Sequence, residues 1–372
     1  MSVYTGDYIE HIRDDALQST YYTFTPRPLM SGNFYTTNDN LAALLADTYR
    51  VLGILEGMEI FVPEKELWAN LTMLQESCFS KMIDYPDFNI ISLFEEQRKD
   101  YINNDIQNIL SAYRYATKTT QSKLNYNDIV SRALHGDDST QKITPRKNPM
   151  FLAKATINYR QYNPTTPENI NSALFDINQY IESSNSDILI KAALCHYQFE
   201  MIHPYECYNG IVGRILPYHM LSNAKLNGMC FCAISTMLYR HKDEYFDRLR
   251  ATQKSGNYIS WIEFFIRIIN EASQYGIEFI RQCNTLFQCE EEKILVRCQD
   301  KREHTSEVYQ YFKRNIVSSI GRASEQLQAS FRTVSKSVAI LQSLGVLSQI
   351  TDGSRNRMFA HSGIMKHLIS FE

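Results

Sequence analysis

Several features that would assign this chain to a class at once are missing from its sequence. The eight cysteines include no Cys-x-x-Cys pair, and several lie on apolar helical faces, which predicts reduced, buried thiols rather than a disulfide framework. No apolar run approaches the roughly 18 residues of a membrane-spanning helix. The N-terminus lacks the charged-then-apolar layout of a signal peptide, and no repeats or low-complexity segments occur. These absences predict a soluble, cytoplasmic protein that does not associate with a membrane.

A large charge of one sign is missing as well. The chain has 38 Lys and Arg against 41 Asp and Glu, so its formal net charge is only -3. This balance excludes a chain that binds polyanions along its whole length and an acidic tail protein. At 372 residues the chain is long enough for about two or three domains with a sizeable core.

What the sequence does contain is helical periodicity. Apolar residues recur at close to a 3.6-residue period over most of the chain, which predicts a mainly α fold. The expected helices cover residues 40–56, 67–83, 101–115, 188–202, 215–224, 241–252 and 258–286, and a further helix opens at Pro167. Pro217 is expected to kink its helix or to confine it to the opening turns.

Two segments between the predicted helices have a different pattern. Residues 136–148 are polar and aperiodic, which predicts a loop. Residues 156–162 alternate and are rich in β-branched and aromatic residues, which predicts a short hairpin or flap that ends at the following prolines. Residues 290–300 are highly charged and are expected to form a connection between domains.

The most informative stretch runs from His203 to Arg214, between two predicted helices. It begins with His-Pro and carries the pair Asn209-Gly210, with Arg214 one helical turn further on. A loop that enters a helix in this way can aim several backbone N–H groups at an anion, with the helix dipole behind them. A histidine at the mouth of such a site is placed to act as a general base.

This stretch resembles the motif of the Fic family, His-Pro-Phe-x-Asp/Glu-Gly-Asn-Gly-Arg-x-x-Arg. The resemblance continues in residues 196–204, 239–246 and 261–265, which are similar to the helices around that motif, and it covers most of residues 20–285. It implies a helical extension at residues 1–95 and a Fic core with a small β flap at residues 96–290.

The resemblance also implies an activity, the transfer of AMP from ATP to a Ser, Thr or Tyr hydroxyl of a target protein. In that reading His203 takes the hydroxyl proton, and Asn209, Gly210, Gly213 and Arg214 bind the phosphates. ATP with Mg²⁺ would be the cofactor. The flap at 156–162 would hold the target protein by adding a strand to it; the alternative is a plain surface hairpin.

Three positions depart from the family motif. Cys207 stands where the family has its Mg²⁺ carboxylate, and a protonated thiol is a poor ligand for a hard cation, which leaves the neighbouring Glu206 as the candidate metal ligand. Tyr208 replaces a glycine and is expected to narrow the anion site. Ile211 replaces the first arginine and so removes a positive charge. Together these replacements predict an impaired nucleotide site.

Many Fic proteins also carry an inhibitory helix, Ser/Thr-x-x-x-Glu-Gly/Asn, whose Glu pairs with the second arginine of the motif. Ser80 and Asp84 match this pattern in part and share one helical face. The resemblance therefore implies a pair between Asp84 and Arg214, with a shorter reach because Asp is one methylene shorter than Glu. The alternative is an ordinary exposed Asp at a helix end.

The C-terminal segment is locally basic. Residues 301–372 hold ten Lys and Arg against five Asp and Glu. Two predicted helices at residues 323–344, followed by a hairpin with an Asp-Gly turn, resemble a winged helix-turn-helix, which we place at residues 291–372. The candidate DNA-phosphate contacts are Arg332, Lys336, Arg355 and Arg357. The alternative is a packing or homodimerisation module with a solvated basic face.

Three functional hypotheses follow from these patterns. The first is a Fic-type adenylyltransferase with an impaired nucleotide site. The second is a catalytically inactive relative that acts as a regulator through a DNA- or protein-binding winged helix. The third is a relative that transfers a different group, such as phosphate or another nucleotide, because a reshaped anion site can accept another leaving group.

Overall fold

A computed structural model describes most of the chain and divides it into two compact units. Unit 1 comprises Met1–Pro63, Thr72–Pro86 and Asn104–Gln274, and unit 2 comprises Glu64–Leu71, Asp87–Asn103 and Tyr275–Glu372. The described residues are 4–12, 20–62, 64–88, 104–119, 125–137, 141–151, 163–298, 302–351, 353 and 357–369. The predicted flap at 156–162 therefore lies outside the described residues, as does Arg355.

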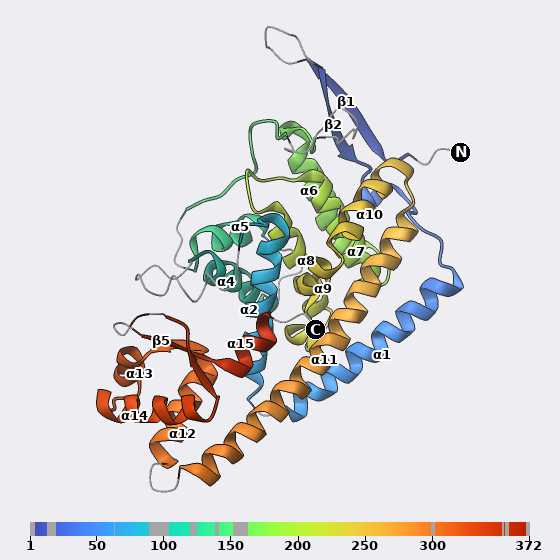
Figure 1. Ribbon diagram of the computed structural model, residues 1–372. Coiled ribbons are helices and arrows are strands. Elements are labelled where there is room, and N and C mark those ends of the chain that lie inside the picture. Colours follow the sequence, from blue (N-terminus) through green and yellow to red (C-terminus); the bar gives the residue numbers. More distant parts are fainter. Residues whose placement is uncertain are drawn as a thin grey trace. The chain divides into compact units, whose positions relative to one another are not determined.

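The fold is mainly α, as the sequence predicted (Figure 1). The elements from residue 6 to 297 are β1 (Gly6–Ile12), β2 (Thr20–Pro26), α1 (Asp39–Phe61), α2 (Lys65–Asp84), α4 (Asn104–Lys118), α5 (Tyr126–His135), α6 (Pro167–Ser183), α7 (Ile188–Ile202), α8 (Asn209–Asn223), α9 (Ile234–Arg240), α10 (Lys242–Ser255) and α11 (Tyr258–Arg297). Helices α2 and α11 each supply residues to both units.

Local signals explain where the predicted helices begin. The side chain of Asn38 accepts a hydrogen bond from Leu41 N at 2.7 Å and caps α1, and Asp187 caps α7 through Leu189 N at 2.8 Å. Such caps satisfy N–H groups that the first helical turn leaves without a partner. Helix α7 begins and ends at the predicted residues.

Several elements were not predicted. Strands β1 and β2 form an antiparallel hairpin in register from Gly6 opposite Pro26 to Ile12 opposite Thr20, and the hairpin projects from the helices of unit 1 (Figure 1). Asn163 forms a parallel bridge with Thr23 of β2. Helix α5 is another unpredicted element, and it packs against α4.

Helix α8 lies in the core of unit 1, where it packs against α7 and α4. It continues through Pro217 to Asn223, so the expectation that Pro217 would confine the helix to its opening turns was wrong. Proline has no backbone N–H. In α8 the residue at position 217 would otherwise donate a hydrogen bond to the carbonyl of Gly213, four residues earlier. That carbonyl accepts a hydrogen bond from His196 Nδ1 of α7 at 2.7 Å instead. A neighbouring helix therefore compensates for the proline.

The expected connection at residues 290–300 was also wrong over most of its length, because α11 continues as a helix to Arg297. A charged segment is rarely buried on all sides, but it can still be a helix, because Glu, Lys and Arg are good helix formers. The proposed domain limits 1–95, 96–290 and 291–372 remain predictions.

Unit 2 ends in alternating helices and short strands. The elements are α12 (Arg302–Asn315), β3 (Val317–Ser319), α13 (Ile320–Gln326), α14 (Phe331–Ser343), β4 (Leu347–Gln349), β5 (Met358–His361) and α15 (Ser362–Ile369). The three strands form an antiparallel sheet in the order β3-β5-β4. Phe312, Val338 and Phe359 belong to one hydrophobic core beneath these helices and strands. The assignment of this region as a winged helix-turn-helix remains a prediction.

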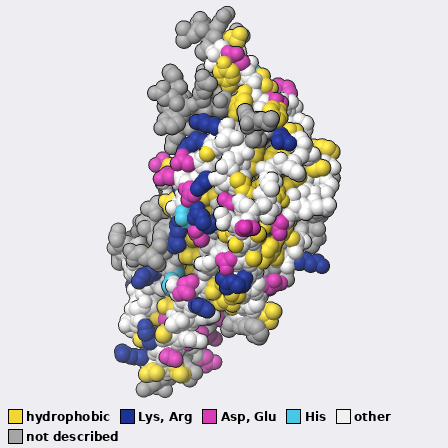
Figure 2. Space-filling model, turned by 90° about the vertical axis from the view of Figure 1, so that its right-hand side faces the viewer, with side chains coloured by type: hydrophobic (Ala, Val, Ile, Leu, Met, Phe, Trp, Pro, Cys, Tyr) yellow, Lys and Arg dark blue, Asp and Glu magenta, His cyan; other side chains and the backbone are white. Residues whose placement is uncertain are grey.

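The surface agrees with the balanced charge of the chain. On the face drawn in Figure 2, Lys and Arg side chains alternate with Asp and Glu side chains, and hydrophobic side chains lie among them. Within the described part of the chain, none of the helices combines the length and the hydropathy that crossing a bilayer requires.

Candidate functional site

The loop between α7 and α8 is bounded by two residues with left-handed backbone conformation. His203 ends α7 with φ 46°, and Tyr208 precedes α8 with φ 62°. A residue with a side chain is strained in this region by about 1–2 kcal/mol. Such strain persists only where surrounding contacts over-determine the backbone, and it is frequent at functional sites.

The side chain of Asn209 closes this loop. Its Oδ1 accepts a hydrogen bond from Tyr205 N at 2.8 Å, and its Nδ2 donates to Tyr205 O at 2.7 Å. The sequence predicted Asn209 as a phosphate-binding residue. Its buried side-chain amide is engaged with the loop backbone and shapes the loop, and its role in phosphate binding remains a prediction.

Arg146 holds the other side of the loop, and the sequence analysis did not single it out. Its guanidinium donates to the carbonyls of His203 (2.8 Å) and Asn148 (2.9 Å) and also to the carbonyl of Thr165. Its backbone N–H donates to Pro204 O at 2.8 Å. Only 3% of Arg146 is exposed, so a buried cation ties three separate segments together through backbone carbonyls.

His203 is held in the form that a general base requires. Its Nδ1 lies 2.5 Å from Glu200 O, and because a carbonyl can only accept, Nδ1 carries the hydrogen. This leaves Nε2 as the basic nitrogen. Burial lowers the pKa of His203, which keeps the imidazole neutral at physiological pH.

Asp84 lies at the N-terminus of α8. A Cβ added to Gly210 would lie 2.7 Å from either carboxylate oxygen of Asp84, so the carboxylate rests against the first turn of the helix. One of these oxygens also lies 2.7 Å from Arg214 Nη2. A helix N-terminus favours a negative group by its dipole and its N–H donors. The carboxylate therefore stands at a position that favours a negative group.

Arg214 is engaged by both residues of the partial inhibitory pattern. It donates to Ser80 Oγ at 2.9 Å and to Ser80 O at 2.7 Å, in addition to Asp84. The Arg214 side chain is 1% exposed and that of Asp84 is 25% exposed. The structure thus brings together Ser80, Asp84 and Arg214, which the resemblance expected to meet, and the inhibitory role of this contact remains a prediction.

These residues surround a cavity of about 600 Å³ in unit 1. His203, Asn209 and Gly210 line it, whereas Gly213 and Arg214 lie behind its wall. Apolar and charged side chains both face the cavity. The apolar ones are Phe24, Ile83, Met150, Met201, Phe246 and Leu249, and the charged ones are Asp84, Glu200, Glu206, Lys242, Arg250 and Lys254.

The three departures from the motif have different structural consequences. Ile211 is fully buried in α8 and brings no charge to the cavity. Tyr208 is half-buried on the cavity wall, with its ring 6.1 Å from that of Tyr85. Burial raises the pKa of the Cys207 thiol, which keeps it protonated. Glu206 is exposed at the cavity rim.

The cavity offers Mg²⁺ few ligands. The cation prefers oxygen ligands, commonly one or two carboxylates together with substrate phosphates, and the protonated thiol of Cys207 is a poor ligand for it. Among the residues that the structure describes, no three His, Cys, Asp or Glu side chains are grouped closely enough to hold a metal ion by themselves. Glu206 as a metal ligand remains a prediction.

Glu200 is a further cavity residue that the sequence analysis did not single out. It is 8% exposed, and its Oε1 accepts no hydrogen bond from any described residue. Burial raises its pKa to about 8, so the carboxyl is protonated at neutral pH. The carboxyl packs against Gly213, where a Cβ would collide with Oε1. A side chain at position 213 would therefore force the Glu200 carboxyl to move.

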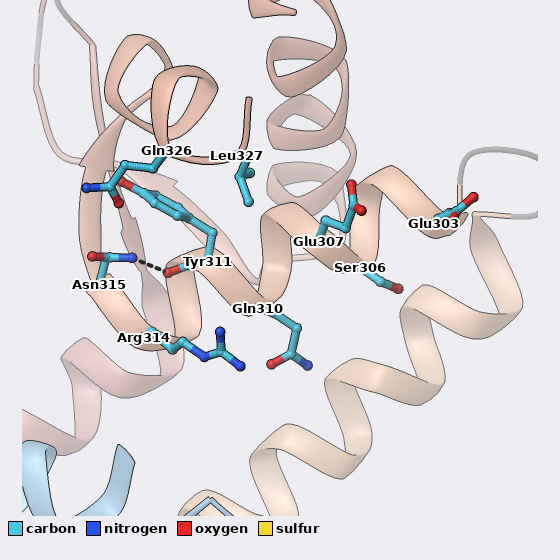
Figure 3. Close-up of a pocket in the computed structure, with 9 residues that line it drawn as sticks. All are labelled: Glu303, Ser306, Glu307, Gln310, Tyr311, Arg314, Asn315, Gln326 and Leu327. Carbon is cyan, nitrogen blue, oxygen red and sulfur yellow. Dashed lines mark hydrogen bonds between the residues drawn. The ribbon is translucent and has the colours of Figure 1, made fainter. Parts of the chain in front are cut away.

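Unit 2 has a groove of its own, drawn in Figure 3. Glu303, Glu307 and Arg314 of α12 lie along it, and Asn315 Nδ2 donates to Tyr311 O at 2.9 Å. Of the predicted DNA contacts, Arg332 and Lys336 are exposed on α14, and the guanidinium of Arg357 lies 5.5 Å from the ring centre of Phe359.

Comparisons with known proteins agree with the motif. Residues 105–221 match the Fic/DOC family, and this region contains α4 to α8, the strained loop and Gly210. The stretch is therefore a Fic domain, as the motif resemblance predicted.

One solved Fic protein has a similar fold, and other solved Fic proteins give weaker matches. A Fic family protein from Desulfovibrio desulfuricans matches with a TM-score of 0.56 and 13% identity, over 89% of this chain and 98% of that one. A Fic domain containing signaling protein from Bacteroides thetaiotaomicron matches with a TM-score of 0.47 and 14% identity, over 64% of this chain and 96% of that one. Residues 134–508 of Fic-1 from C. elegans match with a TM-score of 0.45 and 13% identity, over 65% and 72% of the two chains.

Proposed function

We propose that this chain, whose residues 105–221 form a Fic domain, binds ATP in the cavity at His203 and transfers AMP to a hydroxyl of a target protein. The observation that carries the proposal is the neutral His203, held with a basic Nε2 in a cavity that also contains the N-terminus of α8. Base and anion site are the two elements that such a transfer needs from the protein.

In the proposed reaction, His203 Nε2 takes the proton of the target hydroxyl. The hydroxyl oxygen forms a bond to the α-phosphorus, the bond from that phosphorus to the bridging oxygen of the β-phosphate breaks, and pyrophosphate leaves. The N–H groups at Gly210 stabilise charge on the phosphates. Arg214 contributes once it exchanges Asp84 for a phosphate oxygen, because the two negative groups compete for the same position.

The target protein is proposed to bind at the flap of residues 156–162. Asn163, which directly follows the predicted flap, accepts from Phe24 N at 2.9 Å and donates to Tyr22 O at 3.1 Å. This pairing supports an extended backbone at the cavity edge, to which a target strand can be added.

Mass spectrometry of the purified chain tests the proposal. After incubation with ATP we expect an AMP adduct on the chain itself or on an added substrate protein, with a higher yield in Asp84→Gly and no adduct in His203→Ala. If neither the wild type nor Asp84→Gly forms an adduct under any metal condition, the transferase proposal is rejected.

A non-catalytic regulator is the second candidate. Asp84 fills the anion position of α8, and Arg332 and Lys336 are exposed on α14, which favours a chain that signals through unit 2. A gel shift with duplex DNA at two salt concentrations tests it. Loss of the shift in Arg332→Ala with Lys336→Ala supports this candidate, and an adenylyl adduct without any DNA shift rejects it.

A further inference from the structure

We propose that the cavity at His203 binds the phosphates of its nucleotide without a divalent cation, and that basic side chains of α10 supply the positive charge. This inference rests on the proposed function, because it takes a nucleoside triphosphate as the ligand. The residues are Lys242, Arg250 and Lys254, all of which line the cavity.

The cavity has few groups that can hold a metal ion. Three carboxyl groups line it, and two of them are already engaged. Asp84 is paired with Arg214 at 2.7 Å, and Glu200 is packed against Gly213 inside the protein, whereas Glu206 is exposed at the rim. Magnesium ions at phosphate sites are held by one or two carboxylates together with the substrate phosphates, so only Glu206, at the rim, remains for such an ion.

The arrangement of α10 also supports the inference. The cavity-lining residues of this helix recur with helical spacing and so form one face. They are Lys242, Phe246, Leu249, Arg250, Gln253 and Lys254. A basic residue stands near each end of this face and an apolar stretch lies between them. The pattern suits a ligand with an apolar body and several negative charges.

Lys242 lies at the end of the cavity where the phosphates are proposed to bind. Its Nζ lies 3.5 Å from Met82 O, and Met82 is two residues from Asp84. Because Asp84 rests against Gly210, the amine lies at the same end of the cavity as the N-terminus of α8. A lysine is a compact point charge on a flexible stem and can follow a phosphate oxygen.

Arg250 and Lys254 act further along the helix. Arg250 is eight residues, or about 12 Å, from Lys242 along the helix axis. It forms an ion pair with Asp247, so part of its charge is already neutralised, whereas Lys254 is exposed at the rim. These two residues raise the positive potential of the cavity and attract an anionic ligand. Lys242 compensates for the charge that is missing at Ile211.

Calorimetric titration with ATP, in EDTA and in Mg²⁺, tests the inference on the wild type and on Asp84→Gly. We expect the dissociation constants in the two buffers to agree within about threefold. Lys242→Gln should weaken ATP binding in EDTA by about tenfold or more, as expected for a lost charge-assisted contact. Lys225→Gln is the control, because Lys225 is exposed and does not line the cavity.

Each outcome decides between the two proposals. ATP binding that needs Mg²⁺ overturns the inference and leaves the proposed nucleotide site intact. Binding in EDTA that Lys242→Gln and Arg250→Gln do not change overturns the role of α10. No binding in either buffer, in both the wild type and Asp84→Gly, overturns the nucleotide site and the inference together. Thermal unfolding of each variant shows whether it is folded.

Discussion

The carboxylate of Asp84 pairs with the guanidinium of Arg214 at 2.7 Å and lies beside Gly210 in the first turn of the same helix. A single side chain from α2 therefore occupies the space at the N-terminus of α8 and neutralises its buried arginine. A ligand that places a phosphate at Gly210 must displace this carboxylate. We expect the state of the pair to control whether a nucleotide phosphate can bind in the cavity.

Replacing Asp84 should strengthen nucleotide binding and weaken the fold. Asp84→Gly removes the competing carboxylate, so we expect ATP to bind about tenfold more tightly or better. Arg214 is then a buried cation without its carboxylate and keeps Ser80 as a hydrogen-bond partner. We expect this loss to lower the unfolding free energy by about 1–3 kcal/mol, less than for a fully buried ion pair, because Asp84 is partly exposed. Calorimetry and urea denaturation measure the two effects.

Asp84→Asn is the matched control for that prediction, because it retains the shape and removes the charge. If Asp84→Asn and Asp84→Gly bind ATP as weakly as the wild type, the carboxylate does not compete with phosphate.

Two substitutions at Tyr208 separate backbone strain from side-chain bulk. Tyr208→Gly relieves the left-handed conformation and removes the ring, whereas Tyr208→Ala removes only the ring. We expect the glycine variant to be about 1 kcal/mol more stable than the alanine variant, since glycine adopts positive φ without a steric penalty. Both should bind ATP more tightly than the wild type if the ring narrows the site. Equal stability of the two variants in chemical denaturation would mean that the loop relaxes and stores no strain.

Arg146 should matter for catalysis although it does not line the cavity. Arg146→Met removes donors to the carbonyls of His203, Asn148 and Thr165, and each buried carbonyl left without a partner costs about 1–3 kcal/mol. We expect lower stability and loss of AMP transfer, with partial recovery of both in Arg146→Lys. Unchanged transfer by a folded Arg146→Met would show that the loop keeps its geometry without this arginine.

The comparison of sequence and structure separates local from long-range causes. The helices were predicted because helical periodicity and capping residues such as Asp187 are local signals. The sequence left open whether Pro217 kinks α8 or ends it early, since the answer depends on a hydrogen bond from His196 on another helix. Arg146 was missed because backbone carbonyls are its partners, and these leave no pattern of residue types in the sequence.

The motif allowed a specific site to be predicted in unit 1. It placed His203, Gly210 and Arg214 around one helix start, and the resemblance added Asp84 from a distant helix. Glu200 could not be assigned in this way. Its protonation depends on burial, which results from the packing of α7 against α8 and not from the neighbouring residues in the sequence.

Glu200 should make the stability of the protein depend on pH. Its pKa is about 8 in the folded protein, whereas an unfolded glutamate titrates near 4.5. Between these values the folded chain binds more protons than the unfolded chain, so this group's contribution to stability is fully present below about pH 4.5 and is lost as the pH rises to about 8. The full difference amounts to at most about 5 kcal/mol.

Glu200→Gln removes this titration and preserves the shape of the side chain. We therefore expect the variant to match the wild type within about 1 kcal/mol at pH 5 and to exceed it by about 2–4 kcal/mol at pH 8, because the wild type alone loses stability over this range. Urea denaturation at several pH values measures the difference in unfolding free energy between the two proteins. The other titrating groups are the same in both, so their contributions cancel. The same exchange at the exposed rim, Glu206→Gln, is the matched control, because it removes a carboxyl that is not buried. A stability difference for Glu200→Gln that does not change with pH would show that the Glu200 carboxyl is ionised inside the folded protein, with Arg214 as its compensating charge.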